Sequence, residues 1–139
     1  MTTRLTQLLG IQYPSLEGGM AGVLEARLGA AVSEAGGAGI IASGGRSAEW
    51  LEEQISEARR LTNKPFGVNV QLMAANKDEL VEVVCREKVA FVTLGAGNPV
   101  PFFERLKEAG VKKIPVVPNV KLAKRVEAAG ADAIVVEGM

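Results

Sequence analysis

The sequence of 139 residues contains no histidine and a single cysteine, Cys85. Without histidine the chain cannot by itself form a Ser-His-Asp or Cys-His catalytic arrangement, or a His-ligated zinc site. One cysteine excludes an intramolecular disulfide. Free cysteines are most often buried, so we expect Cys85 to pack in the core rather than act as a nucleophile. No clustered acidic motif is visible, and we assign no metal site.

The chain also lacks an excess of charge of either sign. It has 16 basic and 16 acidic residues, and no run of Lys or Arg exceeds two. This balance argues against nucleic acid and anionic membranes as partners. No apolar run approaches the roughly 20 residues of a membrane span, and the N-terminus lacks the apolar stretch of a secretion signal. We therefore expect a cytoplasmic protein.

Short apolar runs alternate with longer amphipathic stretches along the chain, which predicts βα units around a parallel sheet. The Val and Ile content of these runs is typical of strands covered on both faces. We expect six strands, at residues 14–16, 39–42, 66–70, 90–94, 113–117 and 131–136.

The amphipathic stretches predict helices with identifiable starts. We expect Ser47, Asn76 and Asn119 to cap three of them, with Glu79 completing a capping box at Asn76. For the last of these helices, the spacing of apolar residues predicts a buried stripe. Its members are Leu122, Ala123, Val126 and Ala129.

A helix-to-strand joint recurs three times, as Glu-Ala-Gly or Glu-Ala-Ala-Gly ending at Gly36, Gly110 and Gly130. Glycine there can take the left-handed conformation that ends a helix. Two architectures fit the repeat: an open doubly wound sheet, as in an intact flavodoxin-like domain, or part of a (β/α)₈ TIM barrel. A complete barrel takes about 250 residues. We favour an α/β incomplete barrel of about six βα units, with residues 1–139 as the N-terminal part of one domain of a longer protein.

Ligands bind at the carboxyl ends of parallel strands, and glycine-rich segments follow three of the predicted strands, at 17–22, 43–45 and 95–99. A glycine-rich segment of this kind either simply ends a strand or lets backbone amides approach a ring or a phosphate. Because three such segments lie at the same rim of the sheet, we favour a bound ligand. Asn69 interrupts an apolar strand, and its amide pairs either with a ligand or with a neighbouring strand end. Glu137 ends the last strand, either as a hydrogen-bond acceptor for a ligand or as a solvated residue of the rim.

Short segments in order along the chain, at 3–6, 13–14, 18–21, 34–37, 64–69, 95–99, 114–118, 130–133 and 137–139, carry a family resemblance. They include Gly-Gly-Met-Ala at 18–21, Lys-Pro-Phe-Gly-Val-Asn at 64–69 and Gly-Ala-Gly-Asn-Pro at 95–99. Together they resemble the flavin-dependent enoyl-acyl carrier protein reductase II, within the nitronate monooxygenase (2-nitropropane dioxygenase) superfamily. The resemblance covers essentially the whole chain.

The resemblance implies an FMN-dependent (β/α)₈ barrel that takes a hydride from NADH or NADPH and reduces an enoyl thioester linked to acyl carrier protein, as a homodimer. It implies the following cofactor-binding residues: Gly19, Met20, Ala21, Gly44, Asn69, Gly95 and Glu137. Flavin-dependent oxidation of nitronates is the alternative within the superfamily. An alternative of another class is a non-catalytic barrel fragment that self-associates through unpaired strand edges.

Two departures from the family pattern bear on function. The family usually has glutamine before the Gly-Gly-Met-Ala segment and an aromatic residue after it, whereas this sequence has Glu17 and Gly22. In the family the catalytic histidine lies in a segment that follows the match to Met139. The resemblance therefore implies no catalytic residue within this chain and no activity for the 139 residues alone.

Overall fold

The structure, a computed structural model, describes residues 2–20, 22 and 25–138. Five parallel strands form one sheet in the order β1-β2-β3-β4-β5. The strands are β1 (Gly39–Ala42), β2 (Phe66–Gln71), β3 (Phe91–Gly95), β4 (Lys112–Val117) and β5 (Val135–Val136). The helices are α1 (Arg4–Leu9), α2 (Ala26–Glu34), α3 (Ala48–Leu61), α4 (Lys77–Glu87), the 3₁₀ turn η1 (Val100–Phe102), α5 (Phe103–Ala109) and α6 (Val120–Ala128).

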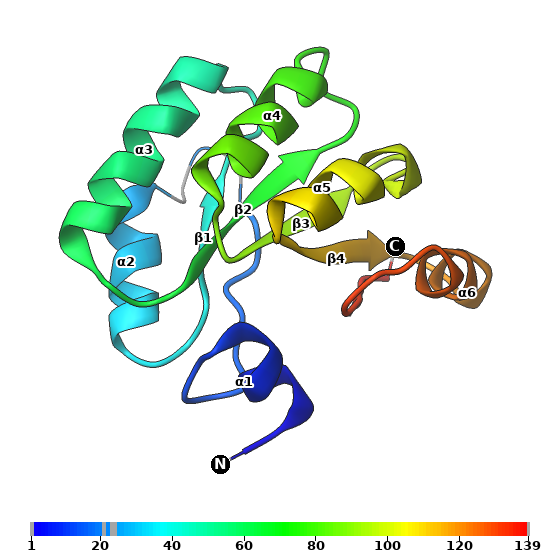
Figure 1. The fold of residues 1–139 in the computed structure, drawn as a ribbon, viewed down its shortest axis with the longest axis horizontal. Helices are drawn as coiled ribbons and strands as arrows, with labels where there is room; N and C mark the ends of the chain where they lie inside the picture. The colour runs from blue at the N-terminus through cyan, green and yellow to red at the C-terminus, as the bar shows by residue number, and fades with distance from the viewer. Residues whose placement is uncertain (1, 21, 23–24, 139) are drawn as a thin grey trace.

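The sheet curls into a half-barrel with helices on its outer face (Figure 1). The larger core lies between the sheet and these helices. A second cluster, which includes Ile40, Phe91 and Ile114, lies on the inner face and packs against Leu9 of α1. Helix α1, which the sequence pattern did not predict, thus closes the amino-terminal end of the half-barrel. The predicted α/β class and incomplete (β/α)₈ barrel are confirmed.

The first predicted strand, 14–16, is wrong as a strand, because it forms only one isolated bridge, Leu16 with Ala38. The next rung of the ladder is formed by a side chain: the Glu17 carboxylate accepts a hydrogen bond from the Ile40 amide, with Oε2 to N at 2.9 Å. A backbone carbonyl would accept that bond in a continuing parallel ladder. The carboxylate therefore ends the strand after one bridge.

The last predicted strand, 131–136, is also too long, since only Val135–Val136 is a strand. An acidic side chain again replaces a rung, because the Asp132 carboxylate accepts from the Lys113 amide at 2.8 Å. The same carboxylate oxygen lies 3.1 Å from the Lys113 ammonium, which is buried. The other four predicted strands are confirmed with ends that differ by at most one residue.

The predicted helix caps are confirmed at Ser47 and Asn119, whose side chains accept hydrogen bonds from the third residue beyond them, at 3.1 and 2.8 Å. The capping box at Asn76 and Glu79 is wrong, because Asn76 makes no side-chain cap bond. Its Nδ2 instead donates to the Arg46 carbonyl at 3.0 Å. Asn76 therefore ties together the loops that follow β1 and β2.

Glycines end helices and also allow one very close backbone contact. Gly36, Gly110 and Gly130 have φ of +102°, +76° and +107°, which confirms the predicted left-handed joints. Where α2 crosses β1, a Cβ on Gly39 would lie 1.8 Å from the Gly29 carbonyl oxygen. Helix α2 therefore lies directly on the β1 backbone and buries small residues there.

Helix α6 lies at the edge of the sheet, and its burial is narrower than the sequence predicts. Val126 is fully buried and Leu122 and Ala123 are half-buried, but Ala129 is exposed because the helix ends at Ala128. Cys85 is half-buried and packs against the larger core, as expected. Among the described residues, no helix is long and apolar enough to cross a membrane.

Candidate functional site

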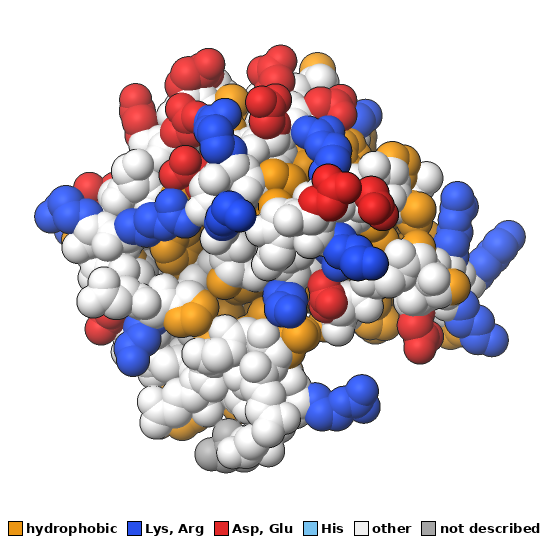
Figure 2. All heavy atoms as spheres, viewed as in Figure 1, with side chains coloured by type: hydrophobic (Ala, Val, Ile, Leu, Met, Phe, Trp, Pro, Cys, Tyr) orange, Lys and Arg blue, Asp and Glu red, His pale blue; other side chains and the backbone are white. Residues whose placement is uncertain are grey.

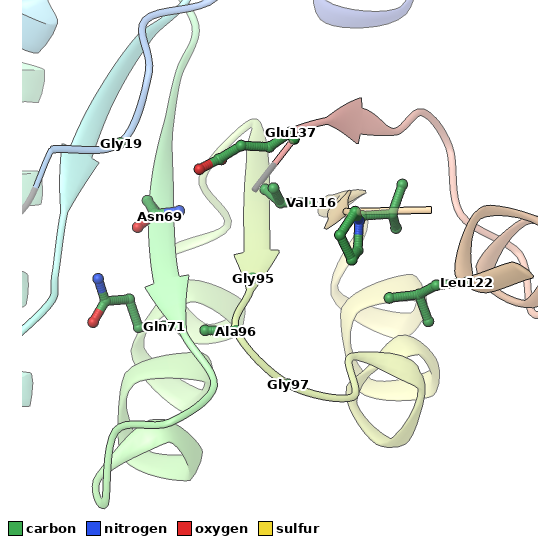
Figure 3. Close-up of a pocket in the computed structure, with 12 residues that line it drawn as sticks. Gly19, Asn69, Gln71, Gly95, Ala96, Gly97, Val116, Leu122 and Glu137 are labelled. Atoms are coloured by element: carbon green, nitrogen blue, oxygen red, sulfur yellow. The ribbon is translucent and has the colours of Figure 1, made fainter. Parts of the chain in front are cut away.

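A pocket of about 400 Å³ opens at the carboxyl ends of β2, β3 and β4. Asn69 and Gln71 project from β2 on one side, and Val116 and Leu122 lie on the other, with the Glu137 side chain extending toward Asn69 (Figure 3). The lining consists of Gly19, Asn69, Gln71, Gly95, Ala96, Gly97, Val116, Val117, Pro118, Leu122, Glu137 and Gly138. Its volume lies in the range of about 300–1,000 Å³ that is typical of small-molecule sites.

Asn69 is held in place by both neighbouring strands. Its Nδ2 donates to the Thr93 hydroxyl at 2.8 Å, and its backbone carbonyl accepts from the Ser43 amide and hydroxyl at 3.1 and 2.7 Å. Of the two expected partners for the Asn69 side chain, a ligand or a neighbouring strand, the structure shows the neighbouring strand for its NH₂ group. Gly19 lies against the same amide, because a Cβ there would be 2.6 Å from Asn69 Cγ. Only a glycine lets the loop before α2 approach this closely.

The turn after β3, at residues 95–97, lines the pocket. Ala96 has φ of +58°, a conformation that is strained for a residue with a Cβ. The Gly95 carbonyl accepts from the Leu72 amide at 2.8 Å, and a Cβ on Gly97 would lie 2.6 Å from Leu72 Cβ. Within the described chain, the Ala96 and Gly97 amides donate no backbone or side-chain hydrogen bond. Two successive amides without acceptors at a pocket are suited to an anionic or carbonyl oxygen.

Glu137 is the pocket's one ionisable side chain among the described residues. Its amide donates to the Val117 carbonyl at 3.1 Å, so the backbone continues along β4 beyond β5. The carboxylate is exposed and is available to accept hydrogen bonds. The facing wall is apolar, formed by Val116, Val117 and Leu122. The site therefore combines a polar side on β2 with an apolar side on β4 and α6.

Four of the seven predicted cofactor-binding residues line the pocket: Gly19, Asn69, Gly95 and Glu137. Met20 is half-exposed and Gly44 follows β1, and neither lines the pocket, while Ala21 lies outside the described residues. The loop at Gly44 folds on itself through a bond from the Arg46 amide to the Ser43 carbonyl at 3.0 Å. The binding roles of all seven residues stay predictions.

Sequence reasoning missed several lining residues and one supporting residue. Gln71 lies two positions after Asn69 on the same face of β2, so strand alternation was an available signal. Leu122 was placed in a helix core, although it also faces the pocket. Thr93 carried no signal, because a threonine within an apolar run is ordinary for a strand.

The half-barrel of parallel strands, with a glycine-lined pocket at their carboxyl ends, defines part of a (β/α)₈ barrel with a ligand site in its usual position. The family model for nitronate monooxygenase matches residues 2–80 and 71–139, so the chain belongs to the nitronate monooxygenase family. Proteins of this family are flavin-dependent oxidoreductases.

Individual relatives agree with this assignment. FabK from Thermotoga maritima is 53% identical with a TM-score of 0.98, over 100% of this chain and 45% of that one. The "(3aS,4S,5R,7aS)-5-hydroxy-7a-methyl-1-oxo-octahydro-1H-indene-4-carboxyl-CoA dehydrogenase" of Mycobacterium tuberculosis is 40% identical over 138 residues, 99% of this chain and 39% of that protein. A "probable nitronate monooxygenase" of Staphylococcus aureus strain JH9 is 34% identical over 172 aligned positions, 97% of this chain and 48% of that protein. The chain thus spans less than half the length of these relatives.

Proposed function

We propose that the protein is an FMN-dependent oxidoreductase that reduces the double bond of an enoyl thioester on acyl carrier protein with NADH or NADPH. The observation that carries the proposal is the match to FabK, an enoyl-acyl carrier protein reductase II, over the whole chain at 53% identity. That match includes every residue of the pocket. Because the chain spans less than half of its relatives, the activity is proposed for a protein of their full length.

The alignments favour a thioester over a nitronate as substrate. The alignment with the S. aureus protein has 172 positions against the 139 residues of this chain, so that relative carries at least 33 additional residues within the matched region. The M. tuberculosis dehydrogenase, whose name specifies a CoA thioester, aligns over 138 positions without such an insertion. The two parts of the family match meet at residues 71–80, which begin at Gln71 in the pocket. We infer that the insertion enters there and reshapes the rim.

The pocket residues fit a flavin ring. The cavity volume suits a fused ring system, Val116 and Leu122 form an apolar wall, and the Ala96 and Gly97 amides have no acceptor within the described chain. These amides would donate to ring or carbonyl oxygens. Asn69, whose Nδ2 is engaged by Thr93, would offer its Oδ1 as an acceptor to a ring N–H.

When bound, FMN would supply hydride chemistry, by which two electrons and one proton from NAD(P)H reach the β-carbon of the enoyl thioester as a hydride equivalent. The apolar wall at Val116 and Leu122 would keep water from the reacting carbon. Glu137 would accept hydrogen bonds from hydroxyl groups of the cofactor. Reduction also needs one proton at the α-carbon, and the resemblance assigns this proton to a histidine that the 139 residues do not contain.

Nitronate oxidation is the second candidate, because the matching family model carries that name. The same flavin pocket would serve, with oxygen in place of NAD(P)H as the co-substrate. One preparation distinguishes the two reactions. Consumption of NADH that requires a 2-enoyl thioester supports the first, and consumption of oxygen that requires a nitronate supports the second.

The sharpest test is a chimera in which this chain replaces the matching 45% of Thermotoga FabK. We expect the chimera to bind FMN and to oxidise one NADH per enoyl thioester reduced. Gly97→Val, whose side chain would collide with Leu72, should abolish flavin binding, whereas Gly18→Ala, with nothing within 4 Å of the added Cβ, should not. A folded chimera that binds FMN but leaves the enoyl thioester unreduced would contradict the proposal.

A further inference from the structure

The outward face of α6 carries a concentration of positive charge. Lys121, Lys124 and Arg125 are spaced i, i+3 and i+4, so they lie on one face of the helix. All three are exposed, and none forms an ion pair with another described residue. The only acid of the helix, Glu127, lies three positions after Lys124 and so borders this face, but the two form no ion pair.

Ion pairs gather on α3 and α4, while Arg27 on α2 and Lys107 on α5, like the cations of α6, form none with another described residue. On α3 and α4, Arg59 pairs with Glu87 at 3.1 Å, and Arg86 pairs with Glu52. Red and blue side chains mix over α3 and α4, and blue side chains project from α6 at the right of the view, with a red side chain beside them (Figure 2). What distinguishes α6 is the grouping of three unpaired cations on one face of a single helix.

This basic face begins at the pocket. Leu122 lines the pocket wall, and Lys121 is the residue immediately before it on the first turn of α6. At 1.5 Å per residue, Lys121 and Arg125 are separated by about 6 Å along the helix axis. Val120, an exposed apolar residue in the same turn, lies beside the cations. An anionic partner on this face would therefore hold its cargo next to the pocket opening.

We propose that the basic face of α6, formed by Lys121, Lys124 and Arg125, docks the acidic surface of the carrier protein that delivers the acyl thioester. This inference rests on the proposed function, since it assigns a partner to the same pocket. Charge complementarity identifies the partner: three unpaired cations steer an acidic protein, and the exposed Val120 gives it an apolar contact. The thioester arm then reaches the pocket past Leu122.

The experiment measures binding of a fluorescently labelled holo-acyl carrier protein to this protein by anisotropy, without flavin or turnover. The test variant carries Lys121→Glu, Lys124→Glu and Arg125→Glu, since glutamate keeps the helix propensity of α6. A control variant with the same change in net charge carries Arg4→Glu, Arg27→Glu and Lys64→Glu, all exposed on other elements. We expect the test variant to bind at least about tenfold more weakly than the control, and high salt to remove the difference.

Equal binding by the two variants, or no binding of the carrier protein by the unchanged protein, would overturn the proposal. A third outcome would also overturn it: the test variant loses coenzyme A binding, the control does not, and the test variant still binds the carrier protein. The cations would then bind the nucleotide part of coenzyme A rather than the carrier protein. Reduction of enoyl thioesters in the FabK chimera is scored separately. If the carrier protein docks but the chimera does not reduce the enoyl thioester, the proposed function is contradicted and the docking is not. If the chimera reduces the thioester equally well with and without the α6 charges, the docking is contradicted and the proposed function is not.

Discussion

The Glu17 carboxylate takes the place of a backbone carbonyl opposite Ile40, accepting its amide at 2.9 Å where a continuing strand would supply the next rung. The Glu17 amide itself donates to the Ala38 carbonyl at 3.0 Å. Glu17 therefore makes the last backbone bond between this segment and the residues at the start of β1, and its side chain then replaces the next one. The loop that begins here brings Gly19 onto Asn69 at the pocket.

This arrangement predicts a pH dependence at Glu17. Burial raises the pKa of the Glu17 carboxyl, and the hydrogen bond from Ile40 opposes that shift only in part. With its folded pKa above the unfolded one, Glu17 stabilises the fold most at low pH, and this stabilisation is lost as pH rises through the folded pKa. Glu17→Gln keeps an acceptor oxygen but does not titrate. Its free energy of unfolding, measured by urea denaturation, should therefore not show this decline with rising pH. Glu17→Ala should be less stable than Glu17→Gln at every pH, and a decline that persists in Glu17→Gln would contradict the assignment.

The bond between Asn69 and Thr93 predicts energetic coupling. Thr93→Val removes the hydroxyl at nearly constant volume and leaves Asn69 Nδ2 without its partner, at a cost of about 1–2 kcal/mol. A double-mutant cycle with Asn69→Ala, followed by chemical denaturation, should give a coupling of about 1 kcal/mol. Thr93→Ser keeps the hydroxyl and should retain most of it. Strictly additive effects would show that the bond does not contribute.

The crossing of α2 over β1 predicts an intolerant glycine. A methyl group at Gly39 would lie 1.8 Å from the Gly29 carbonyl oxygen, so Gly39→Ala forces the helix off the strand. We expect a loss of about 3 kcal/mol or more, measured as a shift of the urea midpoint at unchanged slope. Gly18→Ala, where nothing lies within 4 Å, is the control and should stay within about 0.5 kcal/mol.

The left-handed backbone at Ala96 predicts an unusual response to glycine. A non-glycine residue there costs about 1–2 kcal/mol, and glycine loses about 0.5–1 kcal/mol of chain entropy on folding. Ala96→Gly should therefore raise the unfolding free energy by up to about 1 kcal/mol. Ala31→Gly, exposed within α2, should lower it by about 1 kcal/mol in the same assay. Destabilisation of similar size at both positions would argue against strain at Ala96.

Cys85 should react slowly in the folded protein. Burial raises the pKa of its thiol, and only the thiolate is nucleophilic. Modification by a disulfide reagent at about pH 8 should be at least about tenfold slower than after unfolding in urea. Arg105 opposes the shift, so Arg105→Gln should slow the reaction further. A folded-state rate equal to that of the unfolded chain would contradict the half-buried placement.

The sequence by itself determined the local features of the fold. Four strands are placed to within one residue, because a run of β-branched apolar residues between turns has few other stable conformations. The glycines at 36, 110 and 130 end helices as expected, since only glycine enters the left-handed region at little cost. Asn69, Gly95 and Glu137 were found because strand ends are recognisable and parallel strands end on one rim.

Only the tertiary structure decided which strand ends converge on the pocket and where the ladders stop. Gln71 and Leu122 line the pocket while Gly44 does not, because the curl of the sheet brings β2, β3 and β4 around it. The Glu17 carboxylate replaces the rung after the Leu16 bridge and the Asp132 carboxylate a rung before β5, by accepting from the amides of Ile40 and Lys113. Such contacts join residues 19 to 23 positions apart, so no local pattern encodes them. They form only once hydrophobic burial has set the curvature and register of the sheet.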